Sequence, residues 1–151
     1  MPIKSFRGMM TDKSQDTILL HTNNGSTGYR IKKFEMMSNQ PVNDSTEHIM
    51  MIWKVAQDAG AVAGGMNAPD FSDQTLLAAG VYTNNSSAHT VPSFTSIVFD
   101  NEVFNQDIYI THSDEQTAIS CNYYIELEQI KLDLGEQTVA TLKDIRNIVS
   151  E

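Results

Sequence analysis

Short segments in which apolar and polar residues alternate recur along the chain, separated by clusters of turn-forming residues. Residues 17–21 (TILLH) and 29–36 (YRIKKFEM) are the first clear segments of this kind, and period-two alternation is typical of a half-buried β-strand. Between them, Asn24 and Gly25 supply two positions that tolerate the positive φ of a tight turn. The pattern therefore predicts a β-hairpin over residues 17–36.

A more apolar strand is predicted over residues 48–55. One of its faces carries Met51 and Trp53, and the opposite face, which includes His48 and Met50, is also largely apolar. A strand that is apolar on both faces is usually central in its sheet and covered on both sides. We therefore expect this segment at the centre of a sheet.

The remaining chain continues the same pattern. Residues 57–70 are rich in Ala and Gly and predict a long loop, although a helix over residues 55–63 also fits. Four further strands are expected at residues 76–82, 94–99, 107–111 and 122–134. In the last of them the apolar positions change parity near Gln129, which predicts a β-bulge there. Residues 138–149 fit either a helix face or a strand, and we favour a strand because the long strand before them needs a partner.

These seven to nine short strands, with turns between them and little helix, predict an all-β fold. The expected architecture is an antiparallel β-sandwich or a jelly roll, with strand exceeding helix at least about threefold. The 151 residues have the usual size of one domain, and they contain no internal repeat. We therefore expect one β-sandwich or jelly-roll domain over residues 1–151.

Composition narrows the class of partner. The formal net charge is −9 and the sequence pI is about 4.7, so phosphate backbones repel the chain and direct nucleic-acid binding is disfavoured. Cys121 is the only cysteine, which excludes an intrachain disulfide. The sequence shows no secretory signal and no apolar run near the roughly 20 residues of a membrane span. We expect synthesis in a cytoplasm, where the protein stays or which it leaves inside a larger particle, and no membrane partner.

The common catalytic and cofactor motifs are absent from the sequence. It has no dinucleotide-binding glycine motif, no Walker lysine loop and no Gly-x-Ser-x-Gly. The histidines are His21, His48, His89 and His112, and none is spaced like a zinc-binding pair on a helix. A nucleophilic Cys121 would need a base partner that the sequence does not indicate, so we interpret it as a small buried hydrophobe. We expect no enzyme, no catalytic residue, no cofactor and no metal site.

Other polar groups are better explained by structure than by chemistry. Residues 112–115 (HSDE) would suit a divalent ion, but we interpret them as a solvated loop after a strand. Asp70 and Asp73 lack the further oxygen ligands of a calcium loop, so we interpret them as a helix or turn cap. Glu126 and Glu128 share a strand face that we expect to be solvated.

Methionine is a frequent residue here, and six of the eight methionines stand in adjacent pairs. The pairs are Met9 with Met10, Met36 with Met37, and Met50 with Met51. In a strand, each pair places one side chain on each face. Core packing explains any single pair, but one member could instead meet a neighbouring subunit, since methionine adapts to irregular apolar surfaces.

Aromatic residues offer a different function. Trp53, Tyr82, Tyr109, Tyr123 and Tyr124 could supply stacking surfaces for a carbohydrate or another ligand. Because Trp53 stands in a strongly apolar strand, we expect it to be buried in the core. An exposed cluster of tyrosines would favour ligand binding, whereas a convergent His/Glu cluster inside a barrel would favour a hydrolase.

Three segments of the chain are similar to known sequences: residues 16–26 (DTILLHTNNGS), 104–112 (FNQDIYITH) and 122–132 (NYYIELEQIKL). Together they resemble small virion structural proteins of marine bacteriophages. The similarity runs over most of the chain, although the stretch around residues 60–66 is not part of it. Because these motifs are strands, the resemblance implies a component of the virion and no site residues.

The resemblance and the composition together predict a non-enzymatic phage virion structural protein. We expect a capsid decoration or minor capsid subunit that self-associates as a homo-oligomer, docks on the major capsid protein, or does both. The paired methionines and residues 57–70 are the expected contacts. The alternative is a carbohydrate- or ligand-binding β-sandwich that recognises the host, and a hydrolase on a jelly-roll scaffold ranks third.

Overall fold

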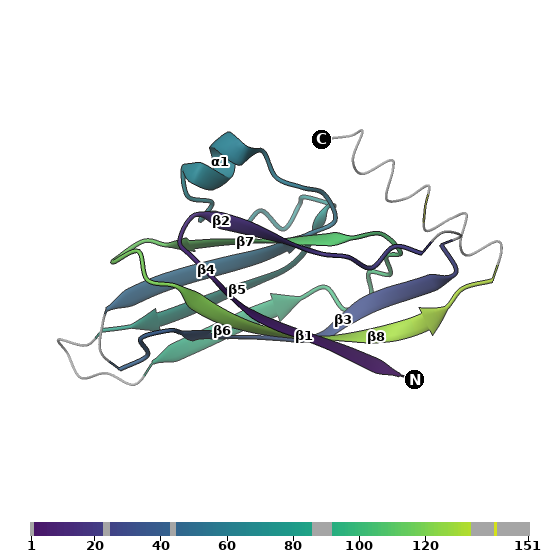
Figure 1. The fold of residues 1–151 in the computed structure, drawn as a ribbon, viewed down its shortest axis with the longest axis horizontal. Coiled ribbons are helices and arrows are strands. Elements are labelled where there is room, and N and C mark those ends of the chain that lie inside the picture. Colours follow the sequence, from purple (N-terminus) through teal and green to yellow (C-terminus); the bar gives the residue numbers. More distant parts are fainter. Residues whose placement is uncertain (1, 23–24, 43–44, 86–91, 134–140, 142–151) are drawn as a thin grey trace.

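The computed structural model describes residues 2–22, 25–42, 45–85, 92–133 and 141. They contain eight strands and one short helix (Figure 1). The elements are β1 (Ile3–Met10), β2 (Ser14–Ile18), β3 (Thr27–Ser38), β4 (Thr46–Trp53), α1 (Ala59–Ala63), β5 (Leu76–Asn84), β6 (Ser93–Val98), β7 (Ile108–Asp114) and β8 (Cys121–Lys131).

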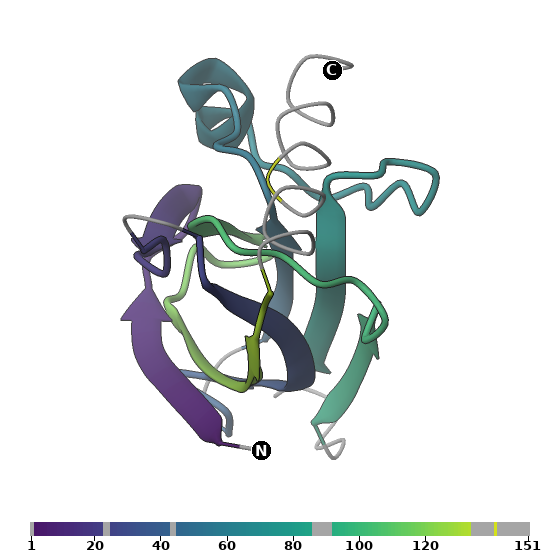
Figure 2. The same cartoon turned by 90° about the vertical axis from the view of Figure 1, so that its right-hand side faces the viewer.

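The strands form two antiparallel sheets that face each other (Figure 2). The smaller sheet has the order β1-β8-β3, and the larger one has the order β2-β7-β4-β5-β6. The sheets pack together where β3 contacts β5 and β6, and β1 leads directly into β2 on the opposite side. The predicted fold class, an all-β sandwich dominated by strand, is therefore confirmed.

The pairing of strands is nested. β1 pairs with β8, β2 with β7, and β4 with β5, so partners meet progressively from the ends of the chain inward. The remaining two strands, β3 and β6, contact each other across the sandwich, while β6 is hydrogen-bonded to β5. A jelly roll of eight strands has a fourth nested pair, β3 with β6, but here β6 belongs to the larger sheet. The protein is therefore an antiparallel β-sandwich that shares three of the four nested pairs of a jelly roll.

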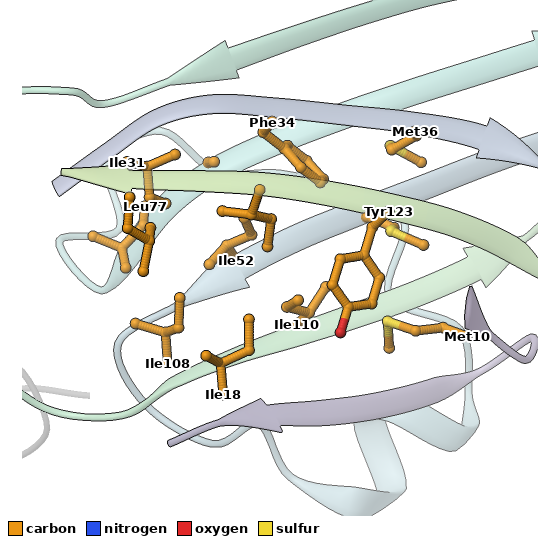
Figure 3. Close-up of a cluster of buried hydrophobic side chains, with 14 of the residues drawn as sticks. Met10, Ile18, Ile31, Phe34, Met36, Ile52, Leu77, Ile108, Ile110 and Tyr123 are labelled. Atoms are coloured by element: carbon orange, nitrogen blue, oxygen red, sulfur yellow. The ribbon is translucent and has the colours of Figure 1, made fainter. Parts of the chain in front are cut away.

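The main core lies between the two sheets. Phe34 and Ile125 from the smaller sheet meet Ile52 and Ile110 from the larger one, and all four are buried. Figure 3 shows these layers of side chains pointing toward one another. Each such side chain contributes roughly 1.5–3 kcal/mol when it leaves water, so this layer holds the two sheets together.

Strand β4 occupies the centre of the larger sheet, as its two apolar faces predict. Met50 and Ile52 face the main core, whereas Met51 and Trp53 belong to a second cluster on the opposite face of the sheet. Trp53 is only 4% exposed, and its indole N–H donates to Thr111 Oγ1 at 3.0 Å. The expected burial of Trp53 is confirmed.

The predicted hairpin over residues 17–36 is wrong. β2 pairs with β7 and β3 pairs with β8, so the chain crosses from one sheet to the other between them. Gly25 nevertheless has the expected positive φ, at +66°, and Asn24 lies outside the described residues. Alternation locates a strand but not its partner, which explains why a sheet crossing resembles a hairpin turn.

The β-bulge also lies elsewhere than predicted. The register of β3 against β8 shifts between Ile31 and Lys33, so β3 carries the extra residue and β8 continues in register past Gln129. The edge strand β1 was not predicted at all. The predicted loop over residues 57–70 contains the short helix α1, which agrees with the alternative assignment.

The predicted strand over residues 138–149 lies outside the described residues, apart from Thr141. That residue accepts a hydrogen bond at its hydroxyl from Asn105 Nδ2, at 2.9 Å. In the part of the chain that the structure describes, no helix has the length and apolar character needed to span a membrane.

Candidate functional site

The outward side of the smaller sheet presents two rows of side chains across three strands. Met9, Asn122 and Met37 are aligned by the strand register in one row, and Arg7, Tyr124 and Glu35 in the next. We call these six residues the methionine face. They line a hollow of about 560 Å³ on the sheet surface, together with Gly8, Met36 and Tyr123.

The two methionines of this face are strongly exposed. Met9 is 54% exposed and Met37 is 58% exposed, whereas their sequence neighbours Met10 and Met36 are buried. Figure 3 shows Met10 and Met36 on the inner side of the sheets, near Tyr123. The expectation that a pair splits between two faces is confirmed for all three pairs, because Met50 and Met51 also face opposite sides of β4. Met50 and Met51 are both buried, because their strand is covered on both sides.

Two carboxylates of β8 beside the methionine face are held by neighbouring side chains. Glu128 accepts a hydrogen bond from Arg30 Nε at 2.8 Å, and Arg30 Nη2 lies 2.6 Å from the same carboxylate oxygen. Tyr124 donates its hydroxyl proton to Glu126 at 2.7 Å, and this hydrogen bond raises the pKa of Tyr124. Glu126 and Glu128 thus lie on the outer face, as predicted, and they orient Tyr124 and Arg30.

The second expected contact region, residues 57–70, lies elsewhere on the molecule. Its residues are mostly exposed, and Val62 of α1 is the buried one among them. Figure 1 shows α1 beside β2 and β7 of the larger sheet, away from β1, β8 and β3. The methionine face and this loop are therefore two separate surfaces.

The aromatic side chains do not gather into a stacking platform. Trp53, Tyr82 and Tyr123 are buried. Tyr109 packs against the cluster around Trp53, on the larger sheet, and Tyr124 lies on the smaller one. Carbohydrate recognition by these five residues thus has little geometric support.

Residues 112–115 were interpreted as a solvated loop, and this interpretation is wrong. His112, Ser113 and Asp114 belong to β7 and are buried. His112 lies diagonally across the β4–β7 pair from His48, whose direct partner in the register is Asp114. The two histidine rings meet inside the sandwich, where His48 Nδ1 lies 2.9 Å from His112 Nε2.

Cys121 completes this group from the opposite sheet. Ligand atoms of His48, His112 and Cys121 all lie within 4.8 Å of one another, and we call these three residues the histidine–cysteine cluster. Their exposed fractions are 0%, 1% and 0%. A substrate cannot reach such side chains in this conformation, so the cluster does not resemble the accessible His/Glu site of a hydrolase.

Burial controls the titration of the cluster. It lowers the pKa of His48 to about 4, an effect that His112 reinforces while Asp114 and Asp12 oppose it. Burial also lowers the pKa of His112 and raises the pKa of the Cys121 thiol to about 12. At neutral pH the cluster therefore holds two neutral imidazoles and a protonated thiol.

Part of this cluster was accessible to sequence reasoning. His48 alternates in phase with Met50 and Ile52, and His112 alternates in phase with Ile108 and Ile110, so parity alone places both rings inward. Their meeting depends on the β4–β7 register, and the approach of Cys121 depends on the packing of two sheets. No local pattern carries that information.

The two acidic residues Asp70 and Asp73 cap turns, as predicted. Asp70 Oδ1 accepts hydrogen bonds from the backbone N–H and the hydroxyl of Ser72, at 2.9 and 2.6 Å. Asp73 Oδ1 does the same for Thr75, at 2.8 and 2.6 Å. Such local bonds are typical of Asx turns and use the oxygen that a cation would need.

No protein-family model matches the chain, and no curated protein matches it. Its function must be inferred from its own residues.

Proposed function

We propose that this chain is a non-enzymatic structural subunit of a phage virion, a capsid decoration or minor capsid protein that associates through its methionine face. The observation that carries the proposal is the exposure of Met9 and Met37, both above one half, on a sheet face that no other described element covers. Burying a whole methionine side chain contributes roughly 1.5–3 kcal/mol. Covering two half-exposed ones favours association.

The composition of the face suits a protein partner. Methionine, tyrosine and arginine are the residue types enriched at interface centres, and Met9, Met37, Tyr124 and Arg7 supply them here. Arg7 and Glu35 lie at opposite ends of one row, on either side of Tyr124. An isologous contact between two copies brings each charge within reach of its opposite on the partner.

The rest of the molecule supports the same proposal. Jelly-roll connectivity, which this fold shares in part, is found in viral capsid domains, although lectins also have it and the fold alone assigns no function. The net charge of −9 suits the outer surface of a particle better than contact with packaged nucleic acid. The resemblance of residues 16–26, 104–112 and 122–132 to virion proteins points the same way.

The proposal is tested by placing charge on the face. In Met9→Glu/Met37→Glu, two carboxylates replace the apolar contacts without touching the core, so the fold is retained and association is lost. Leu19→Glu is the matched control, because Leu19 is 71% exposed and lies outside the methionine face. Sedimentation velocity at several concentrations compares the oligomer content of the three proteins, and co-sedimentation with purified particles compares their capsid binding.

The expected result is that wild type and Leu19→Glu associate with themselves or with particles, while the double variant stays a free monomer with an unchanged circular dichroism spectrum. A stable contact buries about 1,200–2,000 Å² in total. If the double variant associates as wild type does, or if wild type associates with neither copy nor particle, the proposal is refuted.

A further inference from the structure

The histidine–cysteine cluster leaves one polar atom without an explanation. His48 Nε2 is buried, and it has no hydrogen-bond partner among the described residues. A buried polar atom without a partner costs roughly 1–3 kcal/mol, so a native structure usually supplies one in the form of a protein group, a water or an ion.

Hydrogen-bond chemistry identifies which form this nitrogen takes. His112 Nδ1 lies 2.8 Å from the carbonyl oxygen of Thr11, which can only accept, so the proton of neutral His112 is on Nδ1. Its Nε2 then accepts from His48 Nδ1–H. His48 Nε2 is consequently a bare lone pair in the core, and the cluster contains two imidazole lone pairs and one thiol.

This arrangement matches the requirements of a transition-metal site. Imidazole and thiolate are the ligands that Zn²⁺ and related late transition metals prefer. A ligating histidine typically donates its other N–H to a backbone carbonyl, as His112 does to Thr11. This second bond fixes the ring and leaves its Nε2 for the metal.

The electrostatic surroundings favour a cation. Asp114 and Asp12 are the charged groups that act on His48 and His112. Asp114 is held in place by the backbone N–H groups of Glu47, Gln116 and Ile119, at 3.1, 3.0 and 2.8 Å. Two fixed carboxylates therefore lie near a group of three neutral ligands.

We propose that His48, His112 and Cys121 bind a late transition-metal ion, with Zn²⁺ as the representative, and that this ion links the two sheets. Each histidine provides one ring nitrogen and Cys121 provides Sγ. On binding, the thiol proton leaves to solvent and a metal–sulfur bond replaces the S–H bond. The hydrogen bond between the histidines opens, and His48 keeps its ring proton on the nitrogen that does not face the metal.

The role of the ion follows from its position. His48 and His112 come from β4 and β7 of the larger sheet, and Cys121 comes from β8 of the smaller one. A metal held by all three connects the sheets inside the core, where no substrate can enter. Its contribution is therefore to the stability of the subunit, and it does not depend on the assembly role proposed above.

The test lets the metal enter while the core is open, because the folded cluster is closed to solvent. The protein is unfolded in denaturant that contains a chelator, which removes bound metal. It is then refolded either in the presence of Zn²⁺ or in the presence of the chelator. The expected result is one Zn²⁺ per chain after desalting and a higher melting temperature for the metal-loaded form. Refolding with Co²⁺ is expected to give a thiolate-to-cobalt charge-transfer band, which reports Cys121 directly.

Three variants and one control separate this site from surface binding. Cys121→Ala is expected to lose the charge-transfer band and to bind Zn²⁺ at least about tenfold more weakly than wild type. His48→Gln and His112→Gln are expected to weaken Zn²⁺ binding by the same factor. His21→Gln removes an exposed histidine and is expected to bind as wild type does. If a histidine variant fails to fold, Cys121→Ala, which keeps both rings, still decides the outcome.

A wild-type protein that retains no stoichiometric metal overturns the proposal. So does a Cys121→Ala variant that binds Zn²⁺ as tightly as wild type does. In the first case a buried water next to His48 Nε2 is the explanation of the unpaired atom.

Discussion

Gly25 shows how a single residue permits the crossing between the sheets. Its φ of +66° lies in the left-handed region, which costs a residue with a side chain roughly 1–2 kcal/mol. A Cβ at this position would lie 2.9 Å from Asn105 Nδ2. Asn105 is buried and donates to the carbonyl of Gly25 and to the hydroxyl of Thr141, so it cannot move aside without losing these bonds.

We predict that Gly25→Ala lowers the free energy of unfolding by at least about 1 kcal/mol. Gly64→Ala is the matched control, because Gly64 has a φ of −80° and its added Cβ meets only ordinary contacts at 3.5 and 3.6 Å. The control is expected to change stability by less than about 1 kcal/mol. Urea denaturation of the three proteins measures both effects, and equal stability of Gly25→Ala and wild type would show that the turn is not constrained.

Asp107 connects the beginning of β7 to the chain that leaves β2. Its Oδ1 accepts from the backbone N–H of Leu20 at 2.7 Å and of His21 at 3.0 Å, and it lies 2.7 Å from His21 Nδ1. Burial acts to raise the pKa of Asp107, but the hydrogen bonds from His21 and Leu20 outweigh it and lower the pKa. The folded protein therefore prefers the ionised carboxylate.

This preference predicts a pH dependence. A folded-state pKa below the unfolded value stabilises the protein above the unfolded pKa of about 4, and the stabilisation is lost as the pH falls through the folded pKa. Asp107→Asn keeps an acceptor oxygen but has no charge to lose. Its melting temperature is expected to lie below that of wild type at pH 7, and the difference is expected to shrink as the pH falls below about 4. A difference that stays constant over this range would contradict the assignment.

At the scale of elements, the two sheets approach each other closely at Gly80 of β5. A Cβ there would lie 2.8 Å from Met36 Sδ and 2.9 Å from Phe34 Cε2, both on β3 of the opposite sheet. Neither contact is available to a real methyl group, so the sheets must separate or the side chains must shift. Overpacking of this kind typically costs about 1–3 kcal/mol.

We therefore predict that Gly80→Ala destabilises the protein by about 1–3 kcal/mol, although alanine is the smallest change that adds a side chain. The neighbouring Val81 is 40% exposed on the outer side of the same strand. Val81→Ala is expected to cost less than about 1 kcal/mol. Chemical denaturation, with the dependence of the unfolding free energy on denaturant held equal, tests the two variants. A larger loss of stability in Val81→Ala would mean that the inner and outer faces of β5 are misassigned.

Several strands were predictable because their alternation is local. β4, β5 and β6 lie close to their predicted ranges, and the two apolar faces of β4 predicted its central place. β1 escaped prediction because its inward positions include Gly8 while Ile3 and Met9 point outward, so apolar residues occupy both faces and the alternation is broken. Strand partners were not predictable, since they depend on register between segments far apart in the chain.

The same limit applies to the two candidate sites. The methionine pairs predicted that Met9 and Met37 would separate from their core neighbours, because strand parity alone requires it. The two methionines stand in one row because β1 and β3 each pair with β8 in a particular register. Neither register can be read from a single segment of the sequence. For the histidine–cysteine cluster, the buried polar end of β7 looked like a loop, since its packing against β4 is not visible in residues 112–115.

At the scale of the whole molecule, the candidate surfaces are separated by the core. The methionine face occupies the outer side of the smaller sheet, the residues around α1 lie beside the larger one, and the histidine–cysteine cluster lies between the sheets. A subunit of this kind can use one surface for a neighbouring copy and another for a different protein. The metal ion proposed for the core cluster would support both surfaces by holding the two sheets together.

Electron cryo-microscopy of purified phage particles that contain the chain tests the assembly role most directly. We predict density for this β-sandwich on the capsid, with the side chains of Met9, Met37 and Tyr124 covered by a neighbouring subunit. Absence of the chain from intact particles, or its presence with the methionine face open to solvent, would contradict the account.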